Sequence, residues 1–495
     1  MPSFANQCGL GSSARQSALT RATGLIQTGG LELIRFAWCD LHGMLRGKTL
    51  VASAAVPAID AGVGMVSTLL LKDSSDRTAY KVFEARGVAD ELPGFEFGGN
   101  VLLLADPASF QQLPWLDKTG WLLCQPWFPD ARPVAFDTRR VLQTALTRLA
   151  AAGSGLKCGL EIEFHIYKIK PDGQKDQLDP AQASWPGQPP EVSLIHPGFH
   201  MLSEQWMDCS DEPLRIVQQT AQALGLPLLS LEIEFGPSQV EAVFDATDAL
   251  TAADNMVLFR SAVKQALRRA GYHASFMCRP PFANIMSSGW HLHQSLFDLK
   301  TGSNQFMRLA TPDNTTQADA QHVLSETGEF YLAGLLAHAH AMTAFCTPTI
   351  NGYERFRPNA LAPQSVVWGR DNRGAMLRVI GQPGDKATRI ENRVGEPAAN
   401  PYLYIASQIY AGLDGMQRRL KAPPATQSPY DPAAAKLPAS LGDALKALGD
   451  DEALNSGFGS DFVRYFSHIK QAEINRHDAA LDKNDWQARE YFSRI

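Results

Sequence analysis

The pentapeptide Leu-Glu-Ile-Glu-Phe occurs twice in this chain of 495 residues, at positions 160–164 and 231–235. Each copy alternates carboxylates with large apolar side chains, which is the pattern of a strand with one buried face. The two glutamates of each copy therefore share a face of their strand: Glu161 with Glu163, and Glu232 with Glu234. Carboxylates gathered in this way repel one another, which favours a site for a hard divalent cation.

Solvated acids on a half-exposed strand are the commoner explanation of a single Glu-x-Glu. The residues after the second copy favour the metal site instead. The run EFGPSQVE contains a Gly-Pro turn that can return Glu241 to the side of the strand. In SSGWHLHQS, His291 and His293 alternate in an extended segment and share one face. The sequence therefore predicts a site for Mg²⁺ or Mn²⁺ that is built from carboxylates and imidazole.

The composition is that of a globular protein. Hydrophobic residues make up 45% and charged residues 19%, and the formal net charge of -6 gives no reason to expect a nucleic-acid partner. The seven cysteines are scattered and form no Cys-x-x-Cys pair, which indicates reduced thiols in a cytoplasmic protein. The most apolar stretch, around 330–347, is interrupted by His338 and His340, so we expect a core helix there and no membrane span.

The chain divides into three parts by its patterns. Residues 1–20 have no apolar core segment, and we expect a loose leader. Residues 21–125 contain short apolar runs separated by Gly, Asp and Pro, which predicts a small strand-rich domain. In residues 126–495 amphipathic helices alternate with strands, which indicates an α+β or α/β domain.

A dense basic region follows the histidine motif. Guanidinium groups at this density suit phosphate and carboxylate recognition. Acids for two metals and arginines for phosphates together describe phosphoryl transfer from ATP, although the chain has no GxxxxGK[ST] loop. The basic residues are Arg355, Arg357, Arg370, Arg373, Arg378, Lys386, Arg389 and Arg393.

The order of these motifs resembles the glutamine synthetase family. Beside the Glu-x-Glu and EFGPSQVE motifs, the resemblance rests on GWHLHQS, NGYER, RDNR, RIENR and the run ENRVGEPAANPYL. It implies an α+β chain in which an N-terminal β-grasp domain, containing FAWCDLHGMLRGKTL, precedes a catalytic domain with a curved antiparallel sheet and helices. It also implies a homo-oligomer of two stacked hexameric rings, with active sites between adjacent subunits. The family makes an amide from L-glutamate and an amine nucleophile through a γ-glutamyl phosphate formed from ATP.

The resemblance carries roles onto individual residues. One metal, facing glutamate, would be held by Glu163, Glu234 and Glu241, and a second, facing ATP, by Glu161, His291 and Glu391. The ATP contacts would be His293, Ser295, Arg378, Lys386 and Arg389. Glutamate would be bound by Arg355, Arg393 and Glu163, and the catalytic roles would fall to Arg373, Glu391 and Arg355. Glu232 has no role in the motif, and we expect it to support the ligands.

The chain departs from the ammonia-using members at one acid. In RFRPNALAP, Leu361 stands where those members have a glutamate that receives the proton of ammonium, so capture of ammonium should be weak. An apolar wall of Leu361, Phe199, Phe356 and Trp290 would suit an organic amine, and WGRDNR is similar to the γ-glutamylamine branch of the family. An alkyl or aromatic amine such as aniline fits apolar walls better than a polyamine does.

Three alternatives remain at this stage. The acid substrate could differ from glutamate, because Met286 and Ser287 replace residues that contact glutamate in ammonia-using members. Arg355 and Arg393 still favour glutamate as the acid. The chain could be an ordinary glutamine synthetase in which another group replaces the missing base. It could also be a non-catalytic structural relative, which would be expected to have lost metal ligands, whereas all six positions hold competent ones.

Overall fold

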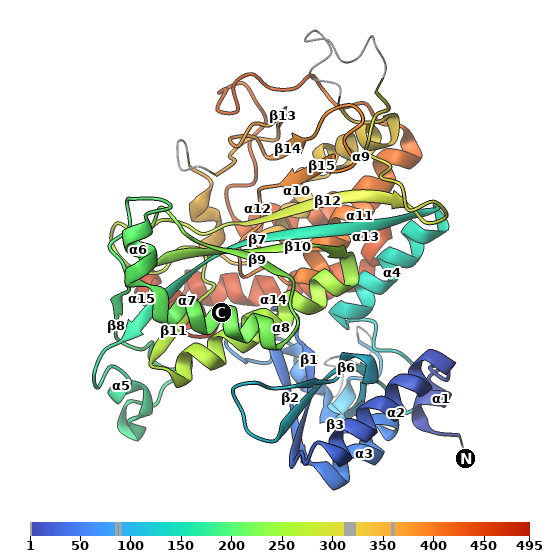
Figure 1. Ribbon diagram of the computed structural model, residues 1–495, viewed down its shortest axis with the longest axis vertical. Coiled ribbons are helices and arrows are strands. Elements are labelled where there is room, and N and C mark those ends of the chain that lie inside the picture. Colours follow the sequence, from blue (N-terminus) through green and yellow to red (C-terminus); the bar gives the residue numbers. More distant parts are fainter. Residues whose placement is uncertain (1, 85–87, 89–91, 311–322, 358–361) are drawn as a thin grey trace.

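The computed structural model describes residues 2–84, 88, 92–310, 323–357 and 362–495, and its chain forms two sheets, each with its own helices (Figure 1). The smaller, N-terminal sheet lies below the larger one in this view. Within the described residues, no helix is both long and apolar enough to cross a membrane.

The N-terminal sheet has the order β2-β1-β6-β4-β3, with the short β5 pairing to β6. Its strands β1 and β6 run parallel side by side, while the other pairs are antiparallel. Helix α3 packs against this sheet, and the arrangement fits the expected β-grasp domain. The elements are β1 (Leu33–Cys39), β2 (Leu45–Val51), α3 (Ala52–Ala61), β3 (Val63–Val66), β4 (Asn100–Ala105), β5 (Gln111–Gln112) and β6 (Thr119–Trp127).

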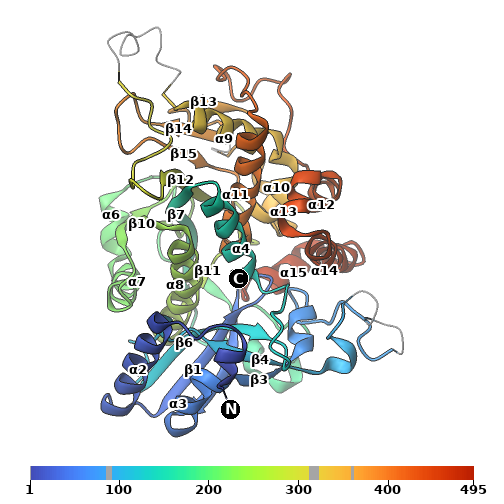
Figure 2. The same cartoon turned by 90° about the vertical axis from the view of Figure 1, so that its right-hand side faces the viewer.

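The N-terminal segment is not the loose leader that we expected. It forms α1 (Phe4–Gln7) and α2 (Ser13–Thr28), and α2 lies beside α3 next to the N-terminal sheet (Figure 2). Arg15 donates to the carbonyl oxygens of Ala105 at 2.7 Å and Ile59 at 3.2 Å, which ties α2 to this domain. The prediction was wrong because α2 buries mainly alanines, which give little hydrophobic contrast along the sequence. Strand β6 continues to Trp127, so the expected boundary after residue 125 lies within a strand.

The larger sheet has the order β13-β14-β15-β12-β7-β10-β9, with β8 and β11 pairing to β7. All its pairs are antiparallel except β13 with β14. The two pentapeptides lie on β7 and at the end of β9, and β10 separates them. The strands are β7 (Ser154–Ile169), β8 (Val192–Leu194), β9 (Leu228–Ile233), β10 (Gln239–Asp248), β11 (Tyr272–Ser275), β12 (Trp290–Asp298), β13 (Trp368–Arg370), β14 (Leu377–Ile380) and β15 (Arg389–Asn392).

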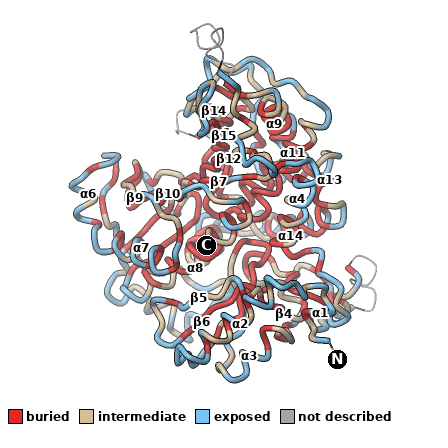
Figure 3. The backbone as a smooth tube through the Cα atoms, turned by 45° about the vertical axis from the view of Figure 1, so that its right-hand side comes forward, coloured by how far each residue is buried: buried red, intermediate tan, exposed pale blue. Residues whose placement is uncertain are grey.

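Helices cover one face of the larger sheet. The rings of Phe164 on β7 and Phe244 on β10 pack edge-on against Phe259 of α8 (Ala249–Arg269), with centroid distances of 6.0 Å and 4.8 Å, respectively. Buried residues are concentrated along β7, β10, β12 and the helices that pack around them (Figure 3). The apolar half of each alternating strand therefore faces helices, which leaves the acidic half for the other face. This arrangement confirms an α+β fold.

Further helices precede, separate and follow the strands of the larger sheet. They are α4 (Thr138–Ala151), α5 (Lys175–Leu178), α6 (Glu204–Cys209), α7 (Asp211–Ala223), α8 (Ala249–Arg269), α9 (Glu326–Ala337), α10 (Ala339–Cys346), α11 (Pro401–Arg418), α12 (Leu441–Asp450), α13 (Glu452–Phe458), α14 (Ser460–Asp478) and α15 (Lys483–Gln487).

Candidate active site

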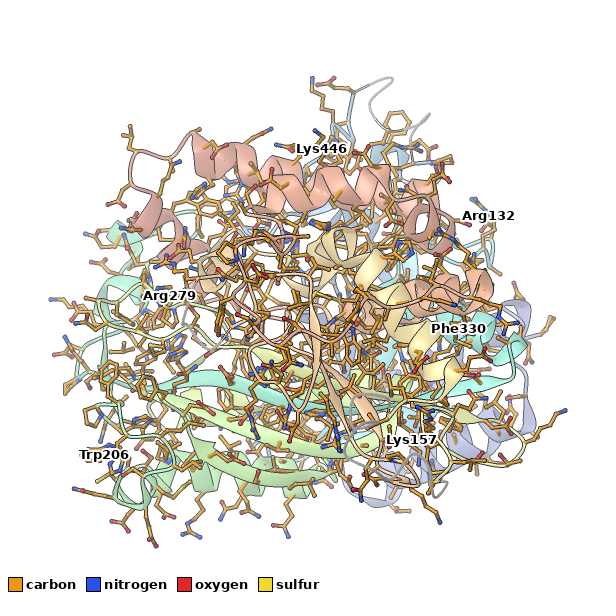
Figure 4. All side chains as sticks on the ribbon, turned by 90° about the horizontal axis from the view of Figure 1, so that it is seen from above. Arg132, Lys157, Trp206, Arg279, Phe330 and Lys446 are labelled. Carbon is orange, nitrogen blue, oxygen red and sulfur yellow. The ribbon has the colours of Figure 1, made fainter. Side chains whose placement is uncertain are left out.

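A row of ionisable side chains crosses the face of the larger sheet that the helices leave open. Strand register sets the row, because residues directly opposite on neighbouring strands point to the same face. Seen from above, the long strands run beneath a dense layer of side chains, from Lys157 near the start of β7 towards Arg279 at the other end (Figure 4). The opposed pairs are Glu232 with Glu241, Glu241 with Glu163, Glu161 with His291, His293 with Glu391, and Glu391 with Arg378.

Ligand atoms converge in three overlapping groups within this row. In each group one atom per residue lies within 4.8 Å of the others. One group contains the three residues that the sequence assigned to the glutamate-facing metal. The set that the resemblance assigned to the ATP-facing metal is divided: His291 belongs to one of the other two groups, Glu391 belongs to the other, and Glu161 belongs to both. His293, which was expected to contact ATP, offers a ligand atom to the group of Glu391. The groups are Glu163 with Glu234 and Glu241; Glu161 with Glu241 and His291; and Glu161 with His293 and Glu391.

The electrostatics of the row differ at its two ends. Burial and the charge of Glu163 raise the pKa of both Glu234 and Glu241. At the other end, burial opposes the charge of Glu161, but hydrogen bonding to His291 and His293 outweighs it and holds its pKa well below the usual range. A divalent cation bound at the first end would favour the ionised form of these carboxylates.

A divalent cation fits this donor set. Burial, followed by the charge of Arg393, lowers the pKa of His291, which favours the neutral imidazole that binds metal. Its Nε2 atom is buried and has no hydrogen-bond partner among the described residues. Carboxylate oxygens with one or two imidazoles are suitable ligands for Mg²⁺ or Mn²⁺.

Gln239 holds the cluster together, and sequence reasoning missed it. Its Nε2 donates to Glu163 Oε2 at 3.1 Å and to Ser288 Oγ at 3.0 Å, while its Oε1 accepts from the N–H of Gly236 at 2.9 Å. The backbone N–H of Gly289 donates to the same Glu163 oxygen at 2.8 Å. Gln239 stands inside the EFGPSQVE motif, so its position beside the acids was the available signal.

Arginines bind Glu391 and line the cavity beside it. Glu391 accepts hydrogen bonds from Arg378 at 3.0 Å and from Arg393. Burial opposes its ionisation, but electrostatic interaction with the His291 ring and with Arg393 holds its pKa below the usual value. Arg373 is exposed and forms no ion pair among the described residues, so its guanidinium is available to a bound anion. The acid and the arginines thus lie where a phosphorylated ligand could contact both.

The remaining predicted ATP contacts lie at the β12–β15 side of the row. Arg389 donates from Nε to His293 Nδ1 at 3.1 Å. Ser295 follows His291 and His293 on β12 at the same period, so it shares their face. Lys386 lies in the exposed turn before β15, and its backbone carbonyl accepts a hydrogen bond from Asn304 at 2.9 Å.

A cavity of about 560 Å³ opens beside the acids and arginines. Part of its wall is apolar, and these residues come from three loops, from strand β10 and from the segment after α11. None of them was predicted as part of the amine pocket. They are Met201, Leu202, Phe235, Val243 and Met286, with Tyr430 beside Arg373 and Gly374.

The predicted amine pocket differs from this wall. Trp290 is fully buried against Tyr404, with ring centroids 5.0 Å apart, and its register on β12 places it on the face opposite His291. It is therefore a core residue, and its assignment to the pocket was wrong. Phe356 packs on Tyr353, and Phe199 packs edge-on against Phe235; neither lines the cavity. Leu361 lies outside the described residues.

Comparison with known proteins gives this site its family. Residues 135–491 match the family described as glutamine synthetase, catalytic domain. A γ-glutamylanilide synthase of an Acinetobacter species is 36% identical over 99% of this chain and 99% of the relative. A glutamate–isopropylamine ligase of a Pseudomonas species is 28% identical over 98% of this chain and 100% of the relative. The chain therefore belongs to the glutamine synthetase family.

Solved structures agree with this assignment. The structure of GmaS in complex with ADP superposes with a TM-score of 0.74 at 27% identity, covering 94% of this chain and 98% of that one. The superposition covers too much of this chain for either sheet to lie wholly outside it.

Proposed function

We propose that this protein ligates an organic amine to the γ-carboxylate of L-glutamate at the expense of ATP. The observation that carries the proposal is the meeting, in one cavity, of the Glu163, Glu234 and Glu241 group with Arg355, Arg373 and Arg393. Carboxylates that bind metal beside arginines that bind anions are the parts that phosphoryl transfer requires.

The reaction has two steps. In the first, a γ-carboxylate oxygen of glutamate attacks the γ-phosphorus of ATP, the bond to the bridging oxygen breaks, and ADP leaves. In the second, the amine nitrogen attacks the acyl carbon, the carbon–oxygen bond to phosphate breaks, and the nitrogen loses one proton. Divalent ions at the two ends of the carboxylate row would neutralise the triphosphate and the acyl phosphate.

The chain's own residues supply binding and charge. Arg355 and Arg393, both buried at the cavity, would hold the α-carboxylate of glutamate. Arg373 would stabilise the charge that develops on the transferring phosphoryl oxygens. Arg389 and His293 would contact the nucleotide from the β12–β15 side, with Ser295, Arg378 and Lys386 near them.

The amine is proposed to be alkyl or aromatic, with aniline as the best representative. Leu202 and Met201 are exposed in the free protein and line the cavity together with Met286 and Phe235, so an apolar ring would cover them. An arylamine is neutral near pH 7 and needs no strong base before attack, which suits a chain with Leu361 where ammonia users carry a glutamate. The name of the Acinetobacter relative supports the same choice.

The test is phosphate release with glutamate, Mg²⁺ and ATP across a panel of ammonium, putrescine, isopropylamine and aniline. We expect aniline to give the highest kcat/KM and ammonium the lowest. Ammonium as the best substrate would refute the proposed amine class. The variant Leu361→Glu is expected to raise the activity with ammonium relative to aniline.

We further propose that the active protein is a ring oligomer of two stacked hexamers, as expected for the family. Mass photometry on the purified protein tests this assembly, and a stable monomer with full activity would contradict it.

A further inference from the structure

A short turn carries Arg355 to the cavity. The 3-10 turn Asn351–Arg355 follows Thr349, and its last residue places the guanidinium at the wall of the cavity. Arg355 Nη1 donates to the carbonyl oxygens of Arg393 at 2.9 Å, Val394 at 3.3 Å and Gly395 at 3.4 Å. The end of the turn is therefore attached to the segment that leads out of β15.

The beginning of the turn is attached to the same segment through a buried carboxyl group. The backbone N–H and the hydroxyl of Thr349 donate to the two oxygens of Glu396, each at 2.8 Å. The Thr349 hydroxyl in turn accepts from the N–H of Gly352 at 3.0 Å. One side chain thus joins Glu396 to the middle of the turn.

The turn packs closely against Glu396 and Thr347 at Gly352. A Cβ atom on Gly352 would lie 2.7 Å from the carboxyl carbon of Glu396 and 2.4 Å from a methyl carbon of Thr347, so only glycine fits there. Asn351 adds a third attachment, because it accepts from the N–H of Arg279 at 2.7 Å and donates to the carbonyl of Arg279 at 3.1 Å. This bond ties the turn to the loop that later supplies Met286 to the cavity.

Glu396 is an unusual residue for a purely structural role. Its side chain is fully buried and forms no ion pair in the part of the chain that the structure describes. Burying a carboxyl group without a cation is unfavourable unless hydrogen bonds compensate for lost water. Both hydrogen bonds to this carboxyl group come from Thr349, one from its backbone N–H and one from its hydroxyl. The carboxyl group therefore serves chiefly to hold this one residue.

We propose that Thr349 and Glu396 are positioning residues that fix the turn Asn351–Arg355, so that Arg355 is pre-oriented for the carboxylate of glutamate. This inference rests on the proposed glutamate-binding role of Arg355. The two carboxyl oxygens of Glu396 lie in one plane and accept from the two donors of Thr349. This bidentate contact restricts the conformations of the turn before the substrate binds. Displacement of Arg355 would weaken glutamate binding but would leave the binding of metal and nucleotide unchanged.

The test uses Thr349→Val, which keeps the shape of the side chain and the backbone N–H donor to Glu396 but removes the hydroxyl, which is the second donor to Glu396 and the acceptor for Gly352. Titration calorimetry with glutamate, in the presence of ADP and Mg²⁺, should show Kd rising by about tenfold or more, as expected when buried donors lose their partners. The Kd of ADP with Mg²⁺ should stay within about twofold of the wild-type value. Thr349→Ser, which restores the hydroxyl, should recover most of the glutamate affinity.

A matched control is Thr343→Val. Thr343 is also buried, but its hydroxyl donates to the carbonyl of Ala339 within its own helix, and among the described residues it has no hydrogen bond to the turn or to Glu396. Its glutamate Kd should remain that of the wild type. An unchanged glutamate Kd in Thr349→Val, or equal losses of glutamate and ADP affinity, would overturn the positioning role.

The outcomes also separate this inference from the proposed function. A wild type that binds glutamate but forms no amide with any amine would refute the ligase activity and leave the positioning role standing. A wild type that ligates amines while Thr349→Val binds glutamate normally would refute the positioning role alone. A wild type that binds no glutamate would refute both.

Discussion

Glu163 on β7 lies directly opposite Glu241 on β10, and both carboxylates point into the same cavity with Glu234. One oxygen of each acid lies within 4.8 Å of the other, so the two carboxylates repel each other unless a cation lies between them, and the raised pKa of Glu241 reflects burial followed by that repulsion. Glu241→Gln would remove one ligand and one charge from this group. We expect kcat/KM for amide formation to fall by about 100-fold or more, and the Mn²⁺ concentration that gives half-maximal activity to rise.

Glu232 offers a matched control for this substitution. It also faces the row, opposite Glu241, but it belongs to none of the three ligand groups among the described residues, and its carboxylate accepts from the Ser230 hydroxyl at 2.9 Å. Glu232→Gln should change kcat/KM by less than about threefold. Equal effects of the two substitutions, measured in one assay at several Mn²⁺ concentrations, would contradict the assignment of Glu241 as a ligand.

The apolar wall predicts a selective effect on the amine. Leu202 is 62% exposed and lines the cavity, so a bound aromatic ring should remove much of its surface from water. Leu202→Ser should therefore lower kcat/KM for aniline by about three- to tenfold while changing the KM of glutamate little. Leu229, 64% exposed but outside the cavity lining, is the matched position for a control Leu→Ser change. A loss shared by aniline and a small hydrophilic amine would argue against a ring-binding wall.

Local alternation was enough to predict which acids share a face, because strand geometry repeats every two residues. The same rule could have excluded Trp290, which alternates with His291 and so belongs to the opposite, buried face. Chain order could not show that β10 lies between the two pentapeptide strands and brings Glu241 between Glu232 and Glu163. That arrangement is set by long-range pairing.

The walls of the cavity were predicted less well than its acids. Met201 and Leu202 come from a loop before α6, and Tyr430 comes from a segment far along the chain. Loops carry no periodicity, so a sequence gives no direct signal of which loop residues meet. The α+β fold and the family were predicted from motifs and are confirmed, whereas the roles of individual site residues stay predictions.

Glu396 predicts a specific pH dependence of stability. Burial raises its pKa to about 7, although the bonds from Thr349 oppose this shift. The folded state therefore holds a proton that the unfolded state releases near pH 4.5, so this group makes the protein less stable as pH rises from about 4.5 to 7. Glu396→Gln should flatten that part of the curve of Tm against pH. Parallel Tm curves for wild type and variant between pH 5 and 7.5 would contradict the buried, easily protonated carboxyl group.

His338 predicts a second loss of stability as pH rises, at a site outside the lining of the cavity. It links two helical segments, because Nδ1 lies 2.6 Å from Asp451 Oδ2 and Nε2 lies 2.9 Å from Asp414 Oδ2. Burial lowers its pKa, but the bonds to both carboxylates outweigh burial and raise the pKa above 6.5. The stabilisation is therefore fully present below pH 6.5 and is lost as pH rises through the higher folded-state pKa.

Substitution of this histidine should reveal that window. His338→Asn should lower Tm by several degrees at pH 6, and by clearly less at pH 9, where the wild-type imidazole has lost its charge. His340→Asn is the matched control, because His340 is exposed and its ring hydrogen-bonds, among the described residues, only to the carbonyl of Lys436. Differential scanning fluorimetry at both pH values measures the difference. A packing defect alone does not depend on the protonation of the side chain that is removed. An equal loss of Tm at pH 6 and pH 9 for His338→Asn would therefore show that a charged His338 does not pair with Asp414 and Asp451.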